Sequence, residues 1–232
     1  MTIDREELLK AREISGLVGR GSFLRVVNYH NTRRADEEQL RKEVRAFRRH
    51  YHSVSIEDLD EWCATGRWPY DRPGLIPAVF EGWRTGYDVM ARILNEEGFR
   101  GWFYIPAFFP DVPVEEQIPF CKPHGLRLFA ADDYDDPRCA MTWEEIKEIS
   151  KDHEILCHTA THACLDESMD PETIRREIID SKRHLEEKIG REVAVFCWRG
   201  GDEYRRSEFA HEYLKEAGYR YLVSNLKIEK IA

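Results

Sequence analysis

The chain has 232 residues, a formal net charge of −9 and 42% apolar residues, with a mean hydropathy of −0.62. This length predicts one domain with a full hydrophobic core, and the acidic balance argues against nucleic acid or an anionic membrane surface as a partner. No apolar run approaches the roughly 20 residues that span a bilayer. The charged start of the chain does not resemble a secretory signal, so we expect a cytoplasmic protein whose six cysteines are reduced thiols.

Strand-like and helix-like patterns alternate along the chain. We expect a helical extension over residues 1–22 and one domain over residues 23–232, with these elements in order: a strand at 23–29, a helix at 35–51, a strand at 53–56, a helix at 57–64, a strand at 75–80, a helix at 85–97, a strand at 102–105, a loop at 106–123, a strand at 126–129, a helix at 142–150, a strand at 154–157, a helix at 171–189, a strand at 193–198, a helix at 207–217 and a strand at 221–224.

This alternation predicts an α/β fold with a parallel sheet that is closed, or nearly closed, into a barrel. An open doubly wound sheet is the alternative. The chain has no Gly-x-Gly-x-x-Gly or P-loop sequence, which argues against a nucleotide-binding form of that alternative.

Two histidines, His158 and His162, follow the predicted strand at 154–157. If the backbone turns helical after that strand, the two imidazoles lie on one face, about one turn apart. Two neutral imidazoles so arranged can share a divalent metal, most often zinc, when a third ligand comes from elsewhere. The alternative is a pair of surface histidines at the start of a helix.

Two further strand ends carry polar groups, and α/β folds have their chemistry at this edge of the sheet. Glu81 follows the strand at 75–80 and is the expected third metal ligand or a general base, with an exposed turn glutamate as the alternative. After the strand at 193–198, Arg199 could bind a substrate charge, and the backbone amides of the turn at Gly200 could hold an oxyanion. A plain turn with a surface arginine is the alternative there.

The order of these segments and their motifs resemble those of the polysaccharide deacetylase family, the carbohydrate esterases that share the nodulation-factor deacetylase homology domain. The resemblance extends over about residues 24–225 and rests on the strand ending at His30, the helix after Glu81, the histidine motif and the long helix from Glu177 to Gly190. It implies a distorted, complete or incomplete (β/α) barrel of about seven or eight mostly parallel strands. The activity that it implies is metal-dependent removal of an N-acyl group, usually acetyl, from an amino sugar.

The chain departs from the family's motifs at several positions. The family's first motif reads Thr-Phe-Asp-Asp-Gly, in which the first aspartate is the general base and the second a metal ligand. With Gly82 kept in register, Phe80 takes the base position here and Glu81 the metal position; a one-residue gap would give Glu81 the base position instead. The arginine that orients the base in the third motif is replaced by Cys197, with Arg199 displaced. We expect no counterpart of the family's late histidine, its general acid.

Two functions are therefore expected from the sequence. In the first, Glu81, His158 and His162 hold a divalent metal, with zinc as the expected ion. A substitute group moves the proton, and the candidates for it are Asp202, His30 and the acidic run at 132–136.

In the second, the fold remains as a carbohydrate-binding or partner-binding module with little turnover. Trp83 and Trp198 are candidates for stacking on a sugar in either case. The expected partner is a small-molecule or oligosaccharide substrate, and a homo-oligomer is compatible with the sequence.

Overall fold

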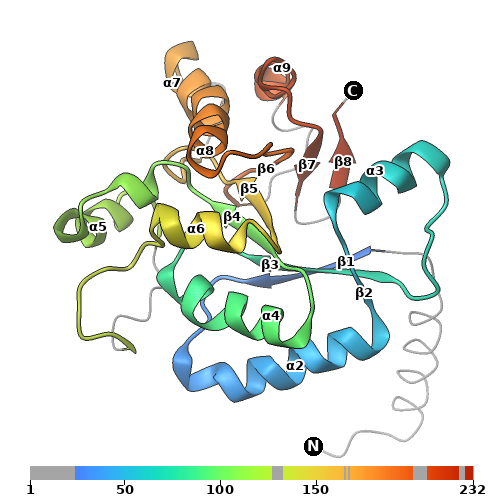
Figure 1. Cartoon of the computed structure of the whole chain (residues 1–232). Coiled ribbons are helices and arrows are strands. Elements are labelled where there is room, and N and C mark those ends of the chain that lie inside the picture. Colours follow the sequence, from blue (N-terminus) through green and yellow to red (C-terminus); the bar gives the residue numbers. More distant parts are fainter. Residues whose placement is uncertain are drawn as a thin grey trace, which may run out of the picture.

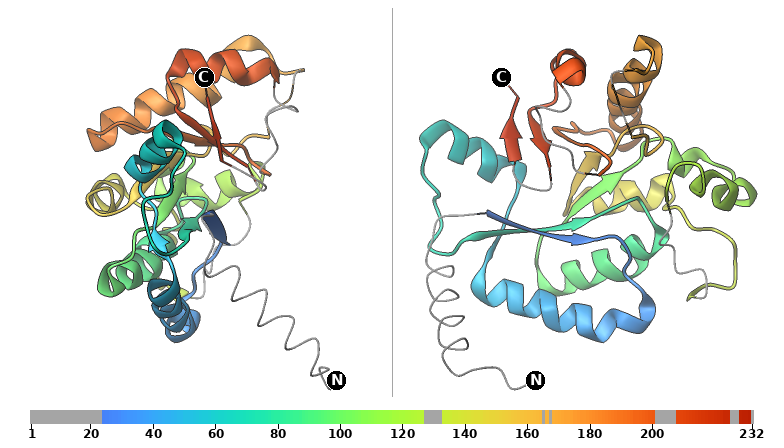
Figure 2. Two further views of the ribbon diagram at one scale, coloured as in Figure 1. Left: turned by 90° about the vertical axis from the view of Figure 1, so that its right-hand side faces the viewer. Right: turned by 180° about the vertical axis from the view of Figure 1, so that it is seen from behind.

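A curled, mostly parallel sheet runs through the protein and forms a half-barrel with helices packed around it (Figures 1 and 2). The computed structural model describes residues 24–126, 133–164, 166, 168–200, 208–224 and 228–231. The helical extension predicted at residues 1–22 and most of the strand predicted at 126–129 lie outside these ranges. None of the helices within them is both long and apolar enough to cross a lipid bilayer.

The strands are β1 (Leu24–Tyr29), β2 (His52–Ser53), β3 (Gly74–Val79), β4 (Trp102–Ile105), β5 (Glu154–Cys157), β6 (Val195–Cys197), β7 (Tyr221–Val223) and β8 (Ile228–Lys230). Their order in the sheet is β1-β3-β4-β5-β6-β7-β8, and β2 pairs with β3. All of these pairings are parallel except that of β7 with β8. The predicted barrel of about seven or eight mostly parallel strands is confirmed, in its incomplete form.

The helices are α2 (Glu37–His50), α3 (Ile56–Thr65), α4 (Arg92–Glu97), α5 (Val114–Cys121), α6 (Trp143–Ile149), α7 (Pro171–Arg175), α8 (Ser181–Ile189) and α9 (Glu208–Ala217). A π-helical segment, η2 (Gly86–Ala91), leads into α4, and a second, η5 (Arg176–Asp180), joins α7 to α8. Capping boxes begin α3, from Ser55 to Asp58, and α6, from Thr142 to Glu145. These reciprocal bonds satisfy amides that a helix start leaves open, so both starts are encoded locally.

Each face of the sheet has its own core, because successive strand residues point to opposite faces. On the outer face, α2, α4, α6, α8 and α9 pack on residues such as Val79, Phe103 and Ile155 (Figure 1). On the inner face, Phe80 and Tyr104 belong to a smaller core that also takes in residues of α3. The inward alternation therefore continues past the end of β3 and turns Phe80 toward the interior of the half-barrel.

Two predictions about elements were wrong. The segment predicted as a loop at 106–123 contains a short 3₁₀ helix, η3 (Phe109–Asp111), and α5. Its prolines suggested a loop, but Pro113 lies just before α5, where its missing N–H costs no helical bond. The sheet also does not end with β7, since β8 adds an antiparallel strand. With three residues, β8 is too short to give a clear alternating pattern.

Candidate active site

The carboxyl ends of β1, β3 and β5 bring the predicted residues His30, Glu81 and His158 to one edge of the sheet. The Phe80 amide donates to the Tyr29 carbonyl over 2.9 Å, which ties the end of β3 to the end of β1. The His158 amide donates to the Ile105 carbonyl over 3.0 Å, which ties the end of β5 to β4. Parallel pairing thus gathers side chains that are far apart in the sequence.

The two histidines of the predicted pair lie together, with ring centroids 4.9 Å apart. Both are buried. The helical turn that would have put them on one face is absent: the chain forms a tight loop in which Thr159 has a φ of 64° and His162 a φ of 62°. The two rings meet through this loop rather than through helical spacing. Their burial excludes the alternative of a pair of surface histidines.

Each imidazole of the pair is oriented by a backbone carbonyl. Nδ1 of His158 donates to the Cys197 carbonyl over 3.0 Å, and Nδ1 of His162 donates to the His124 carbonyl over 2.7 Å. Because a carbonyl only accepts, the proton of each neutral ring is on Nδ1 and the lone pair is on Nε2. Burial lowers the pKa of His158 to about 3 and also lowers the pKa of His162. Both rings are therefore neutral near pH 7, with the tautomer that metal-binding histidines use.

Glu81 is buried and points into the site rather than into solvent. Its Oε2 accepts a hydrogen bond from Nε1 of Trp83 over 2.6 Å, and its Oε1 lies 3.2 Å from Nδ1 of His30. Its φ is 75°, a left-handed conformation that a residue other than glycine adopts at a cost of about 1–3 kcal/mol. The Glu81 charge also raises the pKa of His162, against the larger effect of burial. These contacts exclude the interpretation as an exposed turn glutamate.

The donor set fits a divalent metal in part. His158 and His162 offer two Nε2 lone pairs. A carboxylate has about four acceptor positions, and on Glu81 the contacts with Trp83 and His30 use two of them. Among the residues that the structure describes, however, no three His, Cys, Asp or Glu side chains gather closely enough to hold a metal ion. The two imidazoles thus keep their Nε2 atoms out of these hydrogen bonds, and the Glu81 carboxylate is held by His30 and Trp83.

Phe80, which the ungapped alignment places at the position of the family's general base, has its ring between the polar groups of the site. It stacks on His30, with centroids 4.8 Å apart, and meets the His158 ring edge-on at 5.4 Å. On its other side it stacks on Tyr104 at 4.3 Å. The His30 side chain is 45% exposed. Its Nδ1 lies 3.2 Å from Oε1 of Glu81, and Nε2 is the ring nitrogen that this contact leaves for a bound molecule.

Arg199 lies beside the histidine pair. Its Nη1 is 3.5 Å from the His162 carbonyl, and its charge lowers the pKa values of both His158 and His162. Its guanidinium packs over Gly125, where a Cβ would collide with it and where φ is 68°. The left-handed backbone favours glycine at position 125, whereas a Cβ there would have to displace the flexible end of Arg199. The predicted turn at Gly200 is present, with a φ of 82°, and Asp202 lies outside the described residues.

The two tryptophans expected to stack on a sugar are in the interior, which corrects that expectation. Trp83 is 2% exposed and Trp198 is 3% exposed. Trp83 packs edge-on against Phe109, with centroids 5.4 Å apart, and Trp198 packs edge-on against Phe196 at 4.9 Å. Neither indole presents an open ring face to a ligand. The contribution of Trp83 is instead the hydrogen bond from its Nε1 to Glu81.

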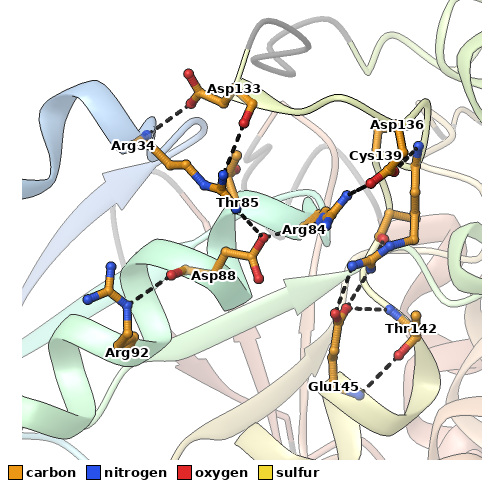
Figure 3. Close-up of polar contacts among 12 residues, drawn as sticks. Arg34, Arg84, Thr85, Asp88, Arg92, Asp133, Asp136, Cys139, Thr142 and Glu145 are labelled. Carbon is orange, nitrogen blue, oxygen red and sulfur yellow. Dashed lines mark hydrogen bonds and ion pairs between the residues drawn. The ribbon is translucent and has the colours of Figure 1, made fainter.

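The described part of the acidic run at 132–136 forms ion pairs with arginines (Figure 3). Asp133 accepts from the Arg34 amide over 2.9 Å, and both carboxylate oxygens of Asp136 accept from Arg84, over 2.9 and 2.8 Å. The Arg84 guanidinium lowers the pKa of Asp136. A carboxylate held in this way is a poor proton acceptor, so these bonds tie the run to Arg34 and to Arg84, which lies just before η2.

Two groups that orient the site were missed in the sequence analysis. The first is the carbonyl of His124, just after α5, which holds His162. The second is Glu177 in η5, whose carboxylate accepts hydrogen bonds from the loop between the two histidines. The resemblance did include the long helix that contains Glu177. Nothing in the sequence ties that residue to the histidine loop.

Comparison with known proteins agrees with this architecture. A family model described as polysaccharide deacetylase matches residues 81–222. The Streptococcus pyogenes deacetylase PplD, solved in complex with acetate, has a TM-score of 0.66 and 12% identity, over 90% of this chain and 85% of that chain. IcaB from Ammonifex degensii has a TM-score of 0.64 and 15% identity, over 88% and 84% of the two chains.

The BpsB deacetylase domain from Bordetella bronchiseptica has a TM-score of 0.61 and 14% identity, over 89% of each chain. No match was found among curated proteins. At these identities the structural matches establish the fold, and the family model, which spans most of the chain, establishes the membership. The chain therefore belongs to the polysaccharide deacetylase family.

Proposed function

We propose that this chain is a hydrolase that removes an N-acyl, acetyl-type group from an amino sugar in a carbohydrate. The observation that carries the proposal is the buried, neutral pair His158 and His162, with both Nε2 lone pairs available, beside the pair Glu81 and His30. Membership of the polysaccharide deacetylase family supports the reaction class. The S. pyogenes deacetylase of similar fold was solved with acetate, which supports acetyl as the acyl group that is removed.

The proposed ligands of a divalent metal are His158, His162 and Glu81, with zinc as the expected ion. Glu81 would contribute an oxygen lone pair that its bonds to His30 and Trp83 leave open. When bound, such an ion lowers the pKa of a water molecule and polarises an acyl carbonyl. The chain's own contribution is to fix the tautomer of both imidazoles and to keep them neutral through burial.

His30 is the proposed proton-transfer group. Glu81 holds Nδ1–H of His30, which leaves Nε2 free to accept a proton from the attacking water and to return one to the amine that leaves. The half-exposed side chain of His30 can reach a substrate, whereas Phe80 has no group that takes up a proton. Arg199, next to the His162 carbonyl, and the turn at Gly200 are the proposed contacts for the polar groups of the sugar or for a developing oxyanion.

The second candidate function is a carbohydrate-binding module with little turnover, and the observation that favours it is Phe80. An apolar ring stands at the base position and is packed between His30 and His158. Cys197 stands where the family has the arginine that orients the base. Loss of a general base typically costs about 10²–10⁴-fold in rate, so the difference between the two functions is a difference in turnover that can be measured.

The test is to measure bound metal and then acetate release from N-acetylglucosamine oligomers, in the parent protein and in His158→Ala. Stoichiometric zinc that is lost in the variant, together with metal-dependent acetate release by the parent, supports the hydrolase. Binding of the oligomers without acetate release supports the second candidate. A parent protein that takes up no metal even when zinc is supplied would falsify the proposed metal site.

A further inference from the structure

The loop that joins the two histidines has a backbone conformation that its sequence does not favour. Thr159 and His162 both have left-handed φ angles, and Thr159 is β-branched, a class for which this region is a genuine outlier. Such conformations persist only where the surroundings over-determine them. The closeness of the two imidazoles depends on this loop, so the groups that hold the loop also decide whether the pair exists.

Glu177 is the side chain that reaches into this loop. It is fully buried, and its Oε2 accepts from the amides of Ala160 and Thr161, over 3.0 and 2.9 Å. Its Oε1 accepts from the Thr161 hydroxyl over 2.9 Å and from Arg176 over 3.1 Å. Two successive amides that converge on one oxygen form an anion-binding concavity of backbone, and here a carboxylate of the same chain fills it.

Within the loop, the Thr159 hydroxyl accepts from the Ala163 amide over 3.0 Å. Bonds to neighbouring segments use the loop's carbonyls. The Ala107 amide donates to the Thr159 carbonyl over 3.0 Å, and the Phe108 amide donates to the Ala160 carbonyl over 2.8 Å. These bonds attach the loop to the chain after β4, whereas the amides of Ala160 and Thr161 donate hydrogen bonds to Glu177. Without the carboxylate, one buried and one partly buried amide lose their acceptor, which removes bonds that hold the loop at its left-handed angles.

Glu177 itself lies in the π-helical segment η5, between α7 and α8. Such segments occur often at functional sites, because the extra residue in the turn re-aims a side chain. On these grounds, and resting on the proposed metal-binding function, we propose that Glu177 is a positioning residue that holds the loop between His158 and His162 so that both imidazoles can bind one metal ion.

The test uses Co²⁺ as the probe, because its visible absorption reports ligand number and geometry. Metal-free wild type and Glu177→Ala are titrated at neutral pH. We expect the alanine variant to lose about 10–100-fold in Co²⁺ affinity, the usual effect of removing a group that orients metal-binding histidines. Glu177→Gln is the conservative variant. Its amide oxygen can still accept from both loop amides, so we expect affinity and spectrum close to those of wild type.

The matched control is Glu97→Ala. Glu97 is also a buried carboxylate held by an arginine, with Arg45 Nε at 2.8 Å, but it lies in α4 and its ion pairs are with α2. This variant should lose stability without a change in Co²⁺ affinity. If Glu177→Ala does not fold, Glu177→Asp replaces it, because a side chain shorter by one methylene cannot keep all of these bonds and should also weaken Co²⁺ binding.

A second readout needs no metal. In protein with ¹⁵N-labelled histidine, the Nδ1–H of His162 should give a slowly exchanging signal in wild type and in Glu97→Ala, and should lose it in Glu177→Ala. If wild type binds no Co²⁺ but this signal depends on Glu177, the positioning role stands and the proposed metal site is wrong. If Glu177→Ala binds Co²⁺ as wild type does and keeps the signal, the positioning role is overturned.

Discussion

The Glu81 carboxylate and the His30 imidazole face each other across the ends of β3 and β1, with Oε1 and Nδ1 3.2 Å apart, although the two residues are 51 positions apart in the chain. Trp83 holds the other carboxylate oxygen. Glu81 is thus fixed from two sides, and the His30 ring is oriented through its Nδ1, which leaves Nε2 outside this contact. This arrangement matches the pairing by which other hydrolases orient a histidine base.

We predict that His30→Gln lowers kcat for acetate release by about 10²–10⁴-fold, with unchanged metal content. Glutamine can still donate a hydrogen bond to Glu81, but it cannot take up a proton near neutral pH. The control is His52→Gln, because His52 pairs with Asp58 in the same manner, at 3.2 Å, next to the amino end of β3 and away from the site. Full activity in His30→Gln would assign proton transfer to another group.

Replacement of the aromatic ring at the base position should restore a proton acceptor. We predict that Phe80→Asp raises the rate of deacetylation, since the new carboxylate would lie beside His30 and His158. The substitution should also destabilise the fold by on the order of 3 kcal/mol, because a packed, 8% exposed ring is lost and a charge is buried. Phe80→Leu is the control and should leave the rate low. An unchanged rate in Phe80→Asp would mean that the base position does not limit turnover.

The pH dependence of stability has a defined contribution from His153. Burial lowers its pKa to about 4, and its Nδ1 accepts from the Gly101 amide over 3.2 Å. The unfolded state takes up a proton near pH 6.5 and the folded state does not. Stability from this residue is therefore full above about pH 6.5 and is lost as the pH falls toward about 4, by on the order of 3 kcal/mol.

The measurement is urea unfolding at about pH 7.5 and about pH 5. In His153→Asn, whose side-chain oxygen can accept from Gly101 but does not titrate, the loss of stability on acidification should be smaller than in wild type. His50→Asn, at an exposed position, should behave as wild type. Equal acid sensitivity in His153→Asn and wild type would show that His153 is not protonated differently in the two states.

The acidic run after residue 132 should prove dispensable for turnover. We predict that Asp136→Asn leaves kcat unchanged, because both oxygens of Asp136 are engaged by Arg84 (Figure 3). Arg84→Gln removes the same ion pair from the other side and should have the same effect on activity. A marked fall in kcat in Asp136→Asn alone would instead give this carboxylate a part in proton transfer.

The sequence predicted the parts of the structure that follow from side-chain pattern. Alternating strands and helices predicted the parallel sheet, and the location of His30, Glu81 and His158 at strand ends predicted that their side chains share one edge of it. The helix α5 was missed because proline was interpreted as a loop signal, although Pro113 precedes the helix and Pro119 lies within it.

The loop between the histidines could not be predicted for a different reason. Its left-handed angles at Thr159 and His162 contradict the preferences of those residue types and arise from tertiary contacts such as those of Glu177. The burial of Trp83 and Trp198 is likewise set by the packing of other segments. Their aromatic character alone is equally consistent with a core position and with a sugar-binding one.

The carbonyls that orient the two imidazoles give the site an unusual tolerance of sequence change. The main chain of residues 197 and 124 supplies the acceptors for His158 and His162, whatever side chains those positions carry. A change of side chain at position 197 should therefore leave the tautomer of His158 as it is. Point substitutions at these two positions would leave the acceptors in place, whereas an insertion or deletion nearby would displace them. An alignment that scores residue identity does not detect these carbonyl acceptors. The property under constraint is the number of residues that separates each carbonyl from its histidine.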